Sequence, residues 1–310
     1  MAILPAKRLR LLGFLVVHSL LLARAPAQKE AAPQVPPGVE QHPDIVYATR
    51  GQGREMKLDL YLPSEGTNRP LALWIHGGGW RKGSKNAWVN PLFLTTRGFA
   101  VASIGYRLSA EAVFPAQVED CKAAVRFLRS HAAAYGLDPD RIAAIGESAG
   151  GNLAAMLGTT GDEKELSDAP DSPVSDRVQA VIDLFGPCDL TAIPPQAPDE
   201  APDTLPYFVH KMLGSSPGVA DRARAASPVL HISPRTPPFL LLHGEGDPLV
   251  PLAQGQEMFA ALQKAGIPSE LIVVPVNYHA GPGFWTETLR EKMAAFLQQA
   301  LGSRAAAPAP

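Results

Sequence analysis

The chain has 310 residues, of which 46% are hydrophobic and 19% are charged, and its formal net charge is −2. This composition is typical of a globular protein with enough apolar residues for a large core. The small net charge gives no electrostatic support for binding to nucleic acid or to an anionic membrane. Both classes of partner are therefore excluded from the expected function.

The N-terminus has the pattern of an export signal. Three basic residues among the first ten precede an apolar run at 11–22, and residues 25–27 read Ala-Pro-Ala. This order predicts a signal peptide over 1–27 that is cleaved after Ala27, and hence a secreted or periplasmic protein with no membrane attachment. The alternative is an uncleaved anchor, although the run is short for a membrane span.

The rest of the chain divides into three parts. A proline-rich lead-in at 28–43 precedes a single domain at 44–302, and residues 303–310 are expected to form a loose tail. The two cysteines, Cys121 and Cys188, could pair or remain free, and the sequence leaves this open. There is no CxxC and no paired-histidine spacing, so we expect neither a metal nor another cofactor.

Short apolar runs alternate with amphipathic stretches along this domain. Two β-rich runs flank Gly51-Gln52-Gly53 and predict an antiparallel hairpin, with strands at 45–49 and 56–62. Buried strands are expected at 71–75, 99–106, 142–145, 178–185, 239–243 and 271–276. Helical spacing predicts helices from Pro115, after the strand at 142–145, at 252–265 and up to Gly302. This alternation predicts a mainly parallel sheet with helices on both faces.

Residues 186–238 interrupt the alternation. The segment is rich in proline, and only a short helix around 207–213 is expected within it. Loops of this length inside a compact domain are often functional, so we expect a partial lid. The alternative is a surface excursion without a role. No part of the segment has the pattern of an apolar amphipathic lid helix.

The sequence Gly146-Glu147-Ser148-Ala149-Gly150 follows a buried strand and precedes an alanine-rich helix. This is the GxSxG pattern of a nucleophile elbow, in the strand–turn–helix context that the motif requires. Glycine at both ends lets neighbouring backbone pass close to the turn. We therefore predict that Ser148 is a catalytic nucleophile, whereas the alternative is an ordinary glycine-rich turn.

A nucleophilic serine needs a base, and the base needs an acid to orient it. Asp247 follows the strand at 239–243, and His279 follows the strand at 271–276. The order Ser148, Asp247, His279 predicts a triad whose members lie at the ends of three strands. Glu245 is the nearest rival for the acid, and Asp183 and Asp189 are weaker rivals. The other histidines are interpreted as structural or as surface residues, and His243 as a packing residue.

The sequence His76-Gly77-Gly78-Gly79-Trp80 follows the strand at 71–75. Glycines allow backbone amides to point at a developing oxyanion without obstruction by side chains. We predict that the amides of Gly78, Gly79 and Ala149 form an oxyanion hole. Neither a GxGxxG nor a GxxxxGK[ST] motif is present, so the loop does not fit a phosphate cradle.

With these motifs and with the sequences at 106–109, 138–151 and 243–251, the chain resembles α/β-hydrolase esterases of the hormone-sensitive-lipase-like and bacterial acetyl- and feruloyl-esterase-like groups. The resemblance implies an α/β-hydrolase fold with a mainly parallel, twisted eight-stranded sheet. It also implies ester hydrolysis through Ser148, Asp247 and His279. Two departures weaken assignment to the first group: Glu147 replaces its frequent aspartate, and the lead-in is too short for its helical cap.

Two other functions compete with a carboxylesterase. One is a peptidase similar to prolyl oligopeptidase, and the other is a non-catalytic binding protein on a hydrolase scaffold. We expect short-acyl esters, with acetylated or feruloylated carbohydrate as candidate substrates, because no segment predicts a deep apolar channel for a long acyl chain. Trp80 and Tyr278 are candidates for stacking on a sugar ring, with packing in the core as the alternative. The oligomeric state is not predicted.

Overall fold

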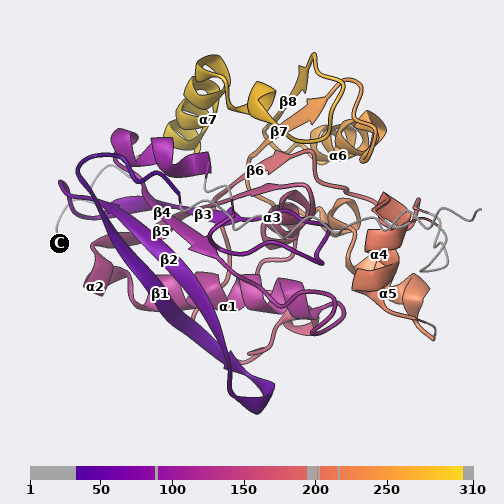
Figure 1. The fold of residues 1–310 in the computed structure, drawn as a ribbon, viewed down its shortest axis with the longest axis horizontal. Coiled ribbons are helices and arrows are strands. Elements are labelled where there is room, and N and C mark those ends of the chain that lie inside the picture. Colours follow the sequence, from indigo (N-terminus) through magenta and orange to yellow (C-terminus); the bar gives the residue numbers. More distant parts are fainter. Residues whose placement is uncertain (1–32, 88–89, 194–200, 202, 216, 303–310) are drawn as a thin grey trace, which may run out of the picture. The chain divides into compact units, whose positions relative to one another are not determined.

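The architecture is a twisted sheet whose two faces are both covered, as shown by a computed structural model (Figure 1). The structure describes residues 33–87, 90–193, 201, 203–215 and 217–302. The expected signal peptide and the expected tail at 303–310 lie outside these residues. The compact unit that contains the sheet spans Ala31–Pro310.

Eight strands form one sheet in the order β1-β2-β4-β3-β5-β6-β7-β8. β1 and β2 form the antiparallel hairpin, β2 is antiparallel to β4, and the strands from β4 to β8 are parallel. The mainly parallel eight-stranded sheet is therefore confirmed. The strands span Val39–Arg50, Arg54–Pro63, Arg69–Ile75, Ala100–Ile104, Leu137–Glu147, Ala180–Leu184, Phe239–Gly244 and Ser269–Val274, in order from β1 to β8.

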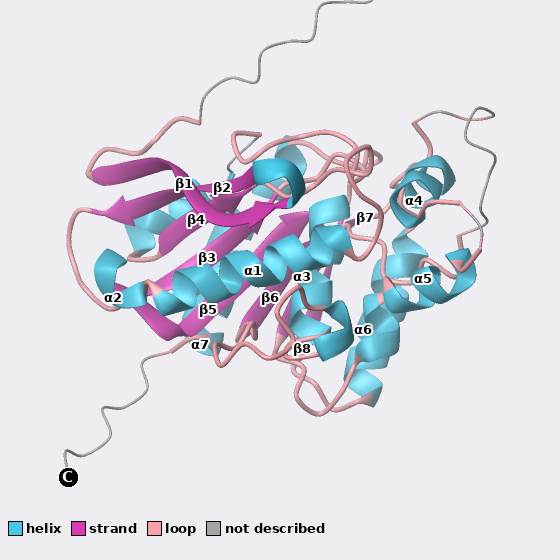
Figure 2. Cartoon of the chain, turned by 90° about the horizontal axis from the view of Figure 1, so that it is seen from below, coloured by secondary structure: helices cyan, strands magenta, loops and turns pink. Residues whose placement is uncertain are grey.

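Alternate residues of the central strands enter two separate cores, because successive side chains of a strand point to opposite faces. In β3, Leu71 and Leu73 pack into one core together with α1 and α3. Ala72 and Trp74 pack into the other core with α7 and the short helix η2 (Asn90–Arg97). Helices thus cover both faces, and Figure 2 shows α1 and α3 lying across one of them.

The helices begin and end close to where the sequence predicts. α1 (Ala116–Ser130) begins after Pro115 and is followed by the short α2 (Ala132–Tyr135). α3 (Ala149–Thr159) follows the elbow, α6 (Leu252–Lys264) ends just before Gly266, and α7 spans Glu287–Ala300. No helix among the described residues combines the length and the apolar character needed to span a bilayer.

Residues 186–238 hold more structure than expected. They include α4 (Leu205–Leu213), α5 (Val219–Ala225) and the short helix η4 (Pro228–His231). Figures 1 and 2 show α4 and α5 side by side. The short helix expected around 207–213 is present as α4, but the expectation that nothing in the segment has an apolar amphipathic pattern is wrong, because α4 buries Leu205, Phe208, Val209, Met212 and Leu213. Helical spacing is present at 205, 208–209 and 212–213. A stretch of nine residues between glycine- and proline-rich turns is nevertheless too short to predict an amphipathic helix strongly.

Two strand boundaries also differ from the expected ones. β1 begins at Val39, inside the expected lead-in, because Val39 pairs with Pro63 at the end of β2. β4 spans only Ala100–Ile104, although the amide of Gly105 still donates to the Lys57 carbonyl oxygen of β2 at 3.0 Å. Both differences arise from pairing between strands, which local apolar patterns do not specify.

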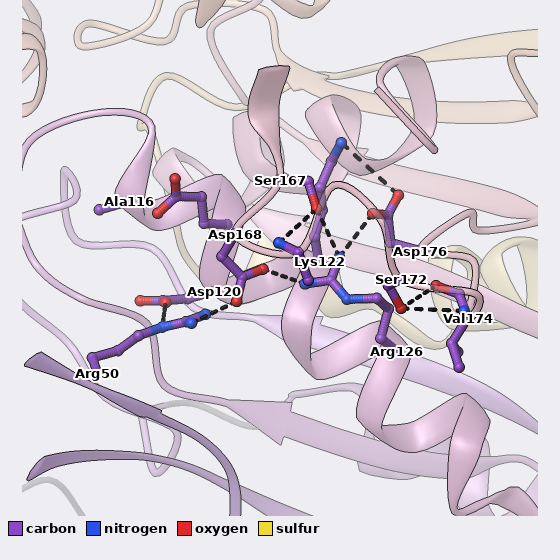
Figure 3. Close-up of polar contacts among 12 residues, drawn as sticks. Arg50, Ala116, Asp120, Lys122, Arg126, Ser167, Asp168, Ser172, Val174 and Asp176 are labelled. Carbon is purple, nitrogen blue, oxygen red and sulfur yellow. Dashed lines mark hydrogen bonds and ion pairs between the residues drawn. The ribbon is translucent and has the colours of Figure 1, made fainter. Parts of the chain in front are cut away.

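A network of buried ion pairs joins β1, α1 and the loop after α3 (Figure 3). Asp120 of α1 accepts a hydrogen bond from Arg50 Nε at 2.7 Å and one from Arg107 Nε at 2.8 Å. Arg126 of α1 pairs with Asp176 at 2.9 Å and also with Asp168. Asp168 in turn accepts a hydrogen bond from Arg50. This network fixes the long hairpin strand and the loop against α1.

Cys121 and Cys188 are both free and buried. Cys121 lies on α1, and Cys188 follows β6, where its thiol donates to the carbonyl oxygen of Gln254 on α6 at 2.9 Å. Burial raises the pKa of both thiols well above their usual range.

Candidate active site

Ser148 lies between β5 and α3 in a backbone conformation that L-residues rarely adopt, with φ 55° and ψ −120°. Such strain persists only where the surrounding structure holds it in place. Here the Ser148 amide donates to the Leu184 carbonyl oxygen at 2.8 Å. The turn also requires glycine at position 150, because a methyl group there would lie 2.1 Å from the Ile75 carbonyl oxygen. The local structure is therefore a strained strand-to-helix turn, as the GxSxG pattern predicts.

The structure brings Ser148, Asp247 and His279 together in one hydrogen-bonded chain. His279 Nε2 lies 2.7 Å from Ser148 Oγ, and His279 Nδ1 lies 2.7 Å from Asp247 Oδ2. The three side chains come from the loops after β5, β7 and β8, whose carboxyl ends share one edge of the sheet. A neutral imidazole that donates from Nδ1 to the carboxylate presents a bare Nε2 to the hydroxyl.

Asp247 is held as a charged acceptor although its side chain is fully buried. Burial alone would raise the pKa of its carboxyl, but the hydrogen bond from His279 and the amides of Leu249 and Val250 lower it below the usual value. These two amides donate to Oδ1 at 2.8 and 3.0 Å, and His279 occupies Oδ2. The carboxylate is therefore oriented on both oxygens.

The other carboxyl groups that the sequence offers as rivals lie elsewhere. Glu245 is exposed to solvent, and it is Asp247 that reaches the histidine. Asp183 is buried in β6, where it accepts from the Gly186 amide at 2.9 Å. Asp189 accepts hydrogen bonds from Thr191, two residues along the chain.

Two buried carboxyl groups near the elbow, those of Asp183 and Glu147, have pKa values above the usual range. Burial raises the pKa of Asp183 to about 7, although the amide of Gly186 opposes the shift. Burial likewise raises the pKa of Glu147, which adjoins Ser148, to about 7. For Glu147, burial is the one cause of the shift. Both groups are therefore partly protonated at neutral pH.

The glycine loop at 76–80 lies beside the elbow. A methyl group at Gly77 would contact Ser148 Cβ at 3.4 Å, which places the loop against the nucleophile. Gly78, Gly79 and Trp80 all have positive φ, at 104°, 62° and 54°. Among the described residues, no protein acceptor takes a hydrogen bond from the amides of Gly78 or Gly79. The loop therefore lies against the elbow and carries two backbone amides that no described acceptor occupies.

The two aromatic candidates for substrate contact differ in exposure. Tyr278 directly precedes His279 and is 38% exposed, and its hydroxyl accepts from the Gly283 amide at 3.0 Å. Trp80 is only 1% exposed and belongs to the core that contains α1 and α3. The burial of Trp80 therefore favours the alternative, packing in the core, over stacking on a sugar ring.

Three residues near the site are not identified by the sequence. Phe185, which follows β6, places its ring edge-on to His279 at 4.8 Å between centroids. His243 is expected only to pack, but it also lies close to Asp247. Its Nε2 is 2.9 Å from the Val250 carbonyl oxygen and 3.7 Å from Asp247 Oδ2. Phe208 of α4 contacts Gly79. In the sequence, Phe185 is only an aromatic residue after a strand, His243 a histidine at a strand end and Phe208 an apolar residue in an expected helix.

Comparison with known proteins agrees with this geometry. The BD-FAE family model matches residues 58–262. Esterase LipQ of Mycobacterium tuberculosis is 34% identical over 235 residues, which cover 73% of this chain and 53% of LipQ. The chain thus spans about half the length of this curated relative, and the match to the carboxylic ester hydrolase LipM has a similar extent, at 55% of that protein.

Solved structures match over most of their own length. A truncated carbohydrate esterase from gut microbiota superposes with a TM-score of 0.73 at 30% identity, covering 85% of this chain and 97% of that one. Esterase Est2 of Thermogutta terrifontis, solved with propionate bound, has a TM-score of 0.68 at 27% identity, covering 85% and 94%. The α/β-hydrolase fold that the resemblance implied is thereby confirmed.

Proposed function

Since the chain belongs to the BD-FAE family, we propose that it is a serine carboxylesterase that uses Ser148, His279 and Asp247. One observation supports this proposal above all others. A hydroxyl, an imidazole and a buried carboxylate are joined by two hydrogen bonds of 2.7 Å beside unpaired backbone amides. This arrangement contains each group that acyl transfer from an ester requires.

The first half of the reaction forms an acyl-enzyme. His279 Nε2 takes the proton from Ser148 as Oγ attacks the ester carbonyl carbon. The amides of Gly78, Gly79 and Ala149 donate to the oxyanion, and Ala149 stands at the first position of α3, where the helix dipole adds positive charge. Asp247 stabilises the imidazolium, which then protonates the departing alcohol oxygen as the carbon–oxygen bond breaks.

The second half releases the acid. Water enters, His279 takes one of its protons, and the resulting hydroxide attacks the acyl carbonyl carbon. The same amides hold the second oxyanion. The bond to Ser148 Oγ then breaks, His279 returns the proton to Oγ, and the carboxylic acid leaves. Phe185 packs against the imidazole throughout and limits its rotation.

The proposed substrates are short-acyl esters, with acetyl or feruloyl esters of carbohydrate as candidates. Two neighbours support this proposal in part: one is named as a carbohydrate esterase, and Est2 was solved with propionate bound. Tyr278 offers an exposed ring next to the base for contact with a sugar. Trp80 does not enter this proposal because its ring is buried.

Export is a separate part of the proposal, supported by the sequence of residues 1–27. The test is expression of the full chain with its own N-terminus, followed by fractionation and N-terminal sequencing of the mature protein. A mature N-terminus at Gln28 in the exported fraction is the expected result. Retention of Met1 in the membrane fraction would instead establish the uncleaved anchor.

The function is tested by labelling with a fluorophosphonate and by a substrate panel. The panel contains p-nitrophenyl esters from acetate to palmitate, acetylated xylan, feruloylated oligosaccharide and a proline amide. We expect labelling of Ser148 and the highest kcat/KM at two to four carbons, by analogy with the size of the acyl groups proposed above. Faster cleavage of the proline amide would indicate a peptidase, and the absence of labelling would indicate a binding protein. A maximum at eight carbons or longer would contradict the short-acyl proposal.

A further inference from the structure

Helix α4 lies directly against the glycine loop. A methyl group added at Gly79 would lie 2.7 Å from Cγ of Phe208 and 2.9 Å from both of its Cδ atoms. The face of the Phe208 ring therefore rests on the backbone of Gly79. Phe208 is itself buried, so this contact is part of the core and not a loose surface contact.

A second contact joins the same helix to the residue that follows the loop. Arg81 donates to the Tyr207 hydroxyl at 3.1 Å and to Asp203 at 3.3 Å. Its guanidinium also lies over two rings, 5.2 Å from the centroid of Tyr207 and 5.7 Å from that of Phe208. The ion pair with Asp203 is largely exposed and contributes little, whereas stacking on the rings restricts the side chain.

The C-terminal end of α4 is attached to the body of the domain. The Met212 carbonyl oxygen accepts from the Phe114 amide at 2.8 Å, just before α1 begins. A methyl group at Gly214, where α4 ends, would lie 2.9 Å from Val113. The helix also contributes five buried side chains to the core that contains α1 and α3. A helix held in this way is a fixed element.

The glycine loop needs external support because its own conformation is costly. Three consecutive residues, Gly78, Gly79 and Trp80, have positive φ, and such a conformation is unfavourable for the tryptophan. Within the loop, the Gly78 carbonyl oxygen accepts from the amides of Arg81 and Lys82, both at 3.1 Å. These bonds close the turn but do not fix its tilt toward Ser148. Phe208 of α4 contacts Gly79 from outside the loop and supplies this external support.

We propose that Phe208 and Arg81 are positioning residues, which hold the amides of Gly78 and Gly79 at the oxyanion through α4. The proposal rests on the esterase function given above. In it, α4 is a part of the catalytic framework and not a lid that opens. Helix α4 of the 186–238 segment thereby acts on the chemical step although none of its side chains belongs to the triad.

The expected effect on kcat and KM follows from the stage of the reaction at which these amides act. They meet a full negative charge only in the transition state, so an error in their position lowers kcat more than it changes KM. Loss of one oxyanion donor costs about 100- to 1,000-fold in kcat. A loosened donor should cost less, so we expect about a tenfold loss for Phe208→Ala.

The experiment measures kcat and KM for p-nitrophenyl acetate, and Ki for a short-chain trifluoromethyl ketone, which forms an oxyanion on Ser148. For Phe208→Ala, kcat should fall about tenfold with KM within about twofold, and Ki should rise by the same factor as kcat/KM falls. Phe208→Leu, which refills most of the volume, should recover activity to within about threefold of wild type. Arg81→Ala should show the same pattern with a smaller loss.

Leu262→Ala is the matched control, because Leu262 is a fully buried residue of α6 in the same core, away from the glycine loop. It should lower Tm as much as Phe208→Ala does, yet leave kcat and Ki unchanged when assayed well below Tm. The proposal is overturned if Phe208→Ala retains wild-type kcat, if KM alone changes, or if Leu262→Ala loses as much activity. An inactive wild-type protein would instead overturn the esterase function on which the proposal rests.

Discussion

The buried carboxyl groups around α1 and those around the nucleophile elbow differ in how their negative charge is compensated. Around α1, Asp120 and Asp176 are matched by arginines from three segments of the chain, so their charges are neutralised by permanent cations. Around the elbow, Asp183 and Glu147 have no cation beside them, and burial raises the pKa of each to about 7. Asp247 is paired, but its partner is a histidine.

The difference follows from what each region has to do. A permanent cation gives a fixed pair, which holds a strand or a loop in place whatever the state of the reaction. A histidine partner can gain and lose a proton, so its pair with Asp247 can strengthen when the imidazolium forms. The raised pKa values of Asp183 and Glu147 also reduce the negative charge near the place where the oxyanion develops, because each carboxyl is partly protonated at neutral pH.

The largest expected effect comes from removing the nucleophile. Ser148→Ala should reduce kcat on p-nitrophenyl acetate by at least about a hundredfold, and by about a millionfold if the triad behaves as in other serine hydrolases. The fold should remain intact because the Ser148 hydroxyl contacts His279 and solvent. Thermal unfolding monitored by circular dichroism provides the control. Activity above a hundredth of wild type would refute the assignment of Ser148.

Exchanging the two acidic side chains after β7 tests which of them orients the base. Asp247→Asn should lower kcat by about a thousandfold or more, because an amide cannot stabilise the imidazolium and favours the wrong tautomer. Glu245→Gln should stay within about twofold of wild type, since Glu245 is exposed. If the Glu245 variant were the more damaged of the two, the acid would be misassigned.

The paired region is tested by stability and not by activity. Asp120→Asn leaves Arg50 and Arg107 without their shared carboxylate and should lower the free energy of unfolding by about 3 kcal/mol or more, measured by urea denaturation. The specific activity of the folded fraction should be unchanged. Glu55→Gln, which breaks the exposed pair with Lys57, is the control and should cost far less. Equal losses from the two variants would contradict a structural role for the network.

The smallest effect concerns the unpaired carboxyl of Asp183 and depends on pH. Because its folded-state pKa is raised to about 7 from 3.8, the folded protein binds more protons than the unfolded chain between these values. The wild type should therefore lose stability as pH rises from about 4 to 7. Asp183→Asn keeps an acceptor for the Gly186 amide and removes this loss.

The measurement is the difference in Tm between the two proteins at pH 5 and at pH 8. The Asp183→Asn variant should gain several degrees on the wild type at pH 8 and clearly less at pH 5, where the carboxyl is still protonated in the folded protein but already ionised in the unfolded chain. A constant difference at both pH values would mean that Asp183 does not titrate in this range.

Much of this arrangement could be predicted because it follows from chain order. Ser148, Asp247 and His279 each come directly after an apolar run, and parallel strands bring their carboxyl ends to one edge of the sheet. The glycines around Ser148 marked the turn itself. These signals are local, so a single sequence contains them.

The features that could not be predicted depend on contacts between distant segments. Trp80 follows the glycine loop, but only its positive φ, held by the folded loop, turns the ring into the core. Phe208 appears in the sequence as one apolar residue among prolines, and its position on Gly79 depends on how α4 packs. The pairing of Arg50 with Asp168 spans 118 positions along the chain. The spacing of residues along the chain does not predict such contacts.

The two buried cysteines give this protein an internal pair of reporters. A thiol reagent cannot reach Cys121 or Cys188 in the folded molecule, because both are fully buried and their raised pKa values keep them protonated. Each lies in a different region, Cys121 on α1 within the ion-pair network and Cys188 where the 186–238 segment begins. The rate at which each sulfur is alkylated therefore measures how often its own region opens. Comparing the two rates would show whether the framework and the segment that carries α4 unfold together or one before the other.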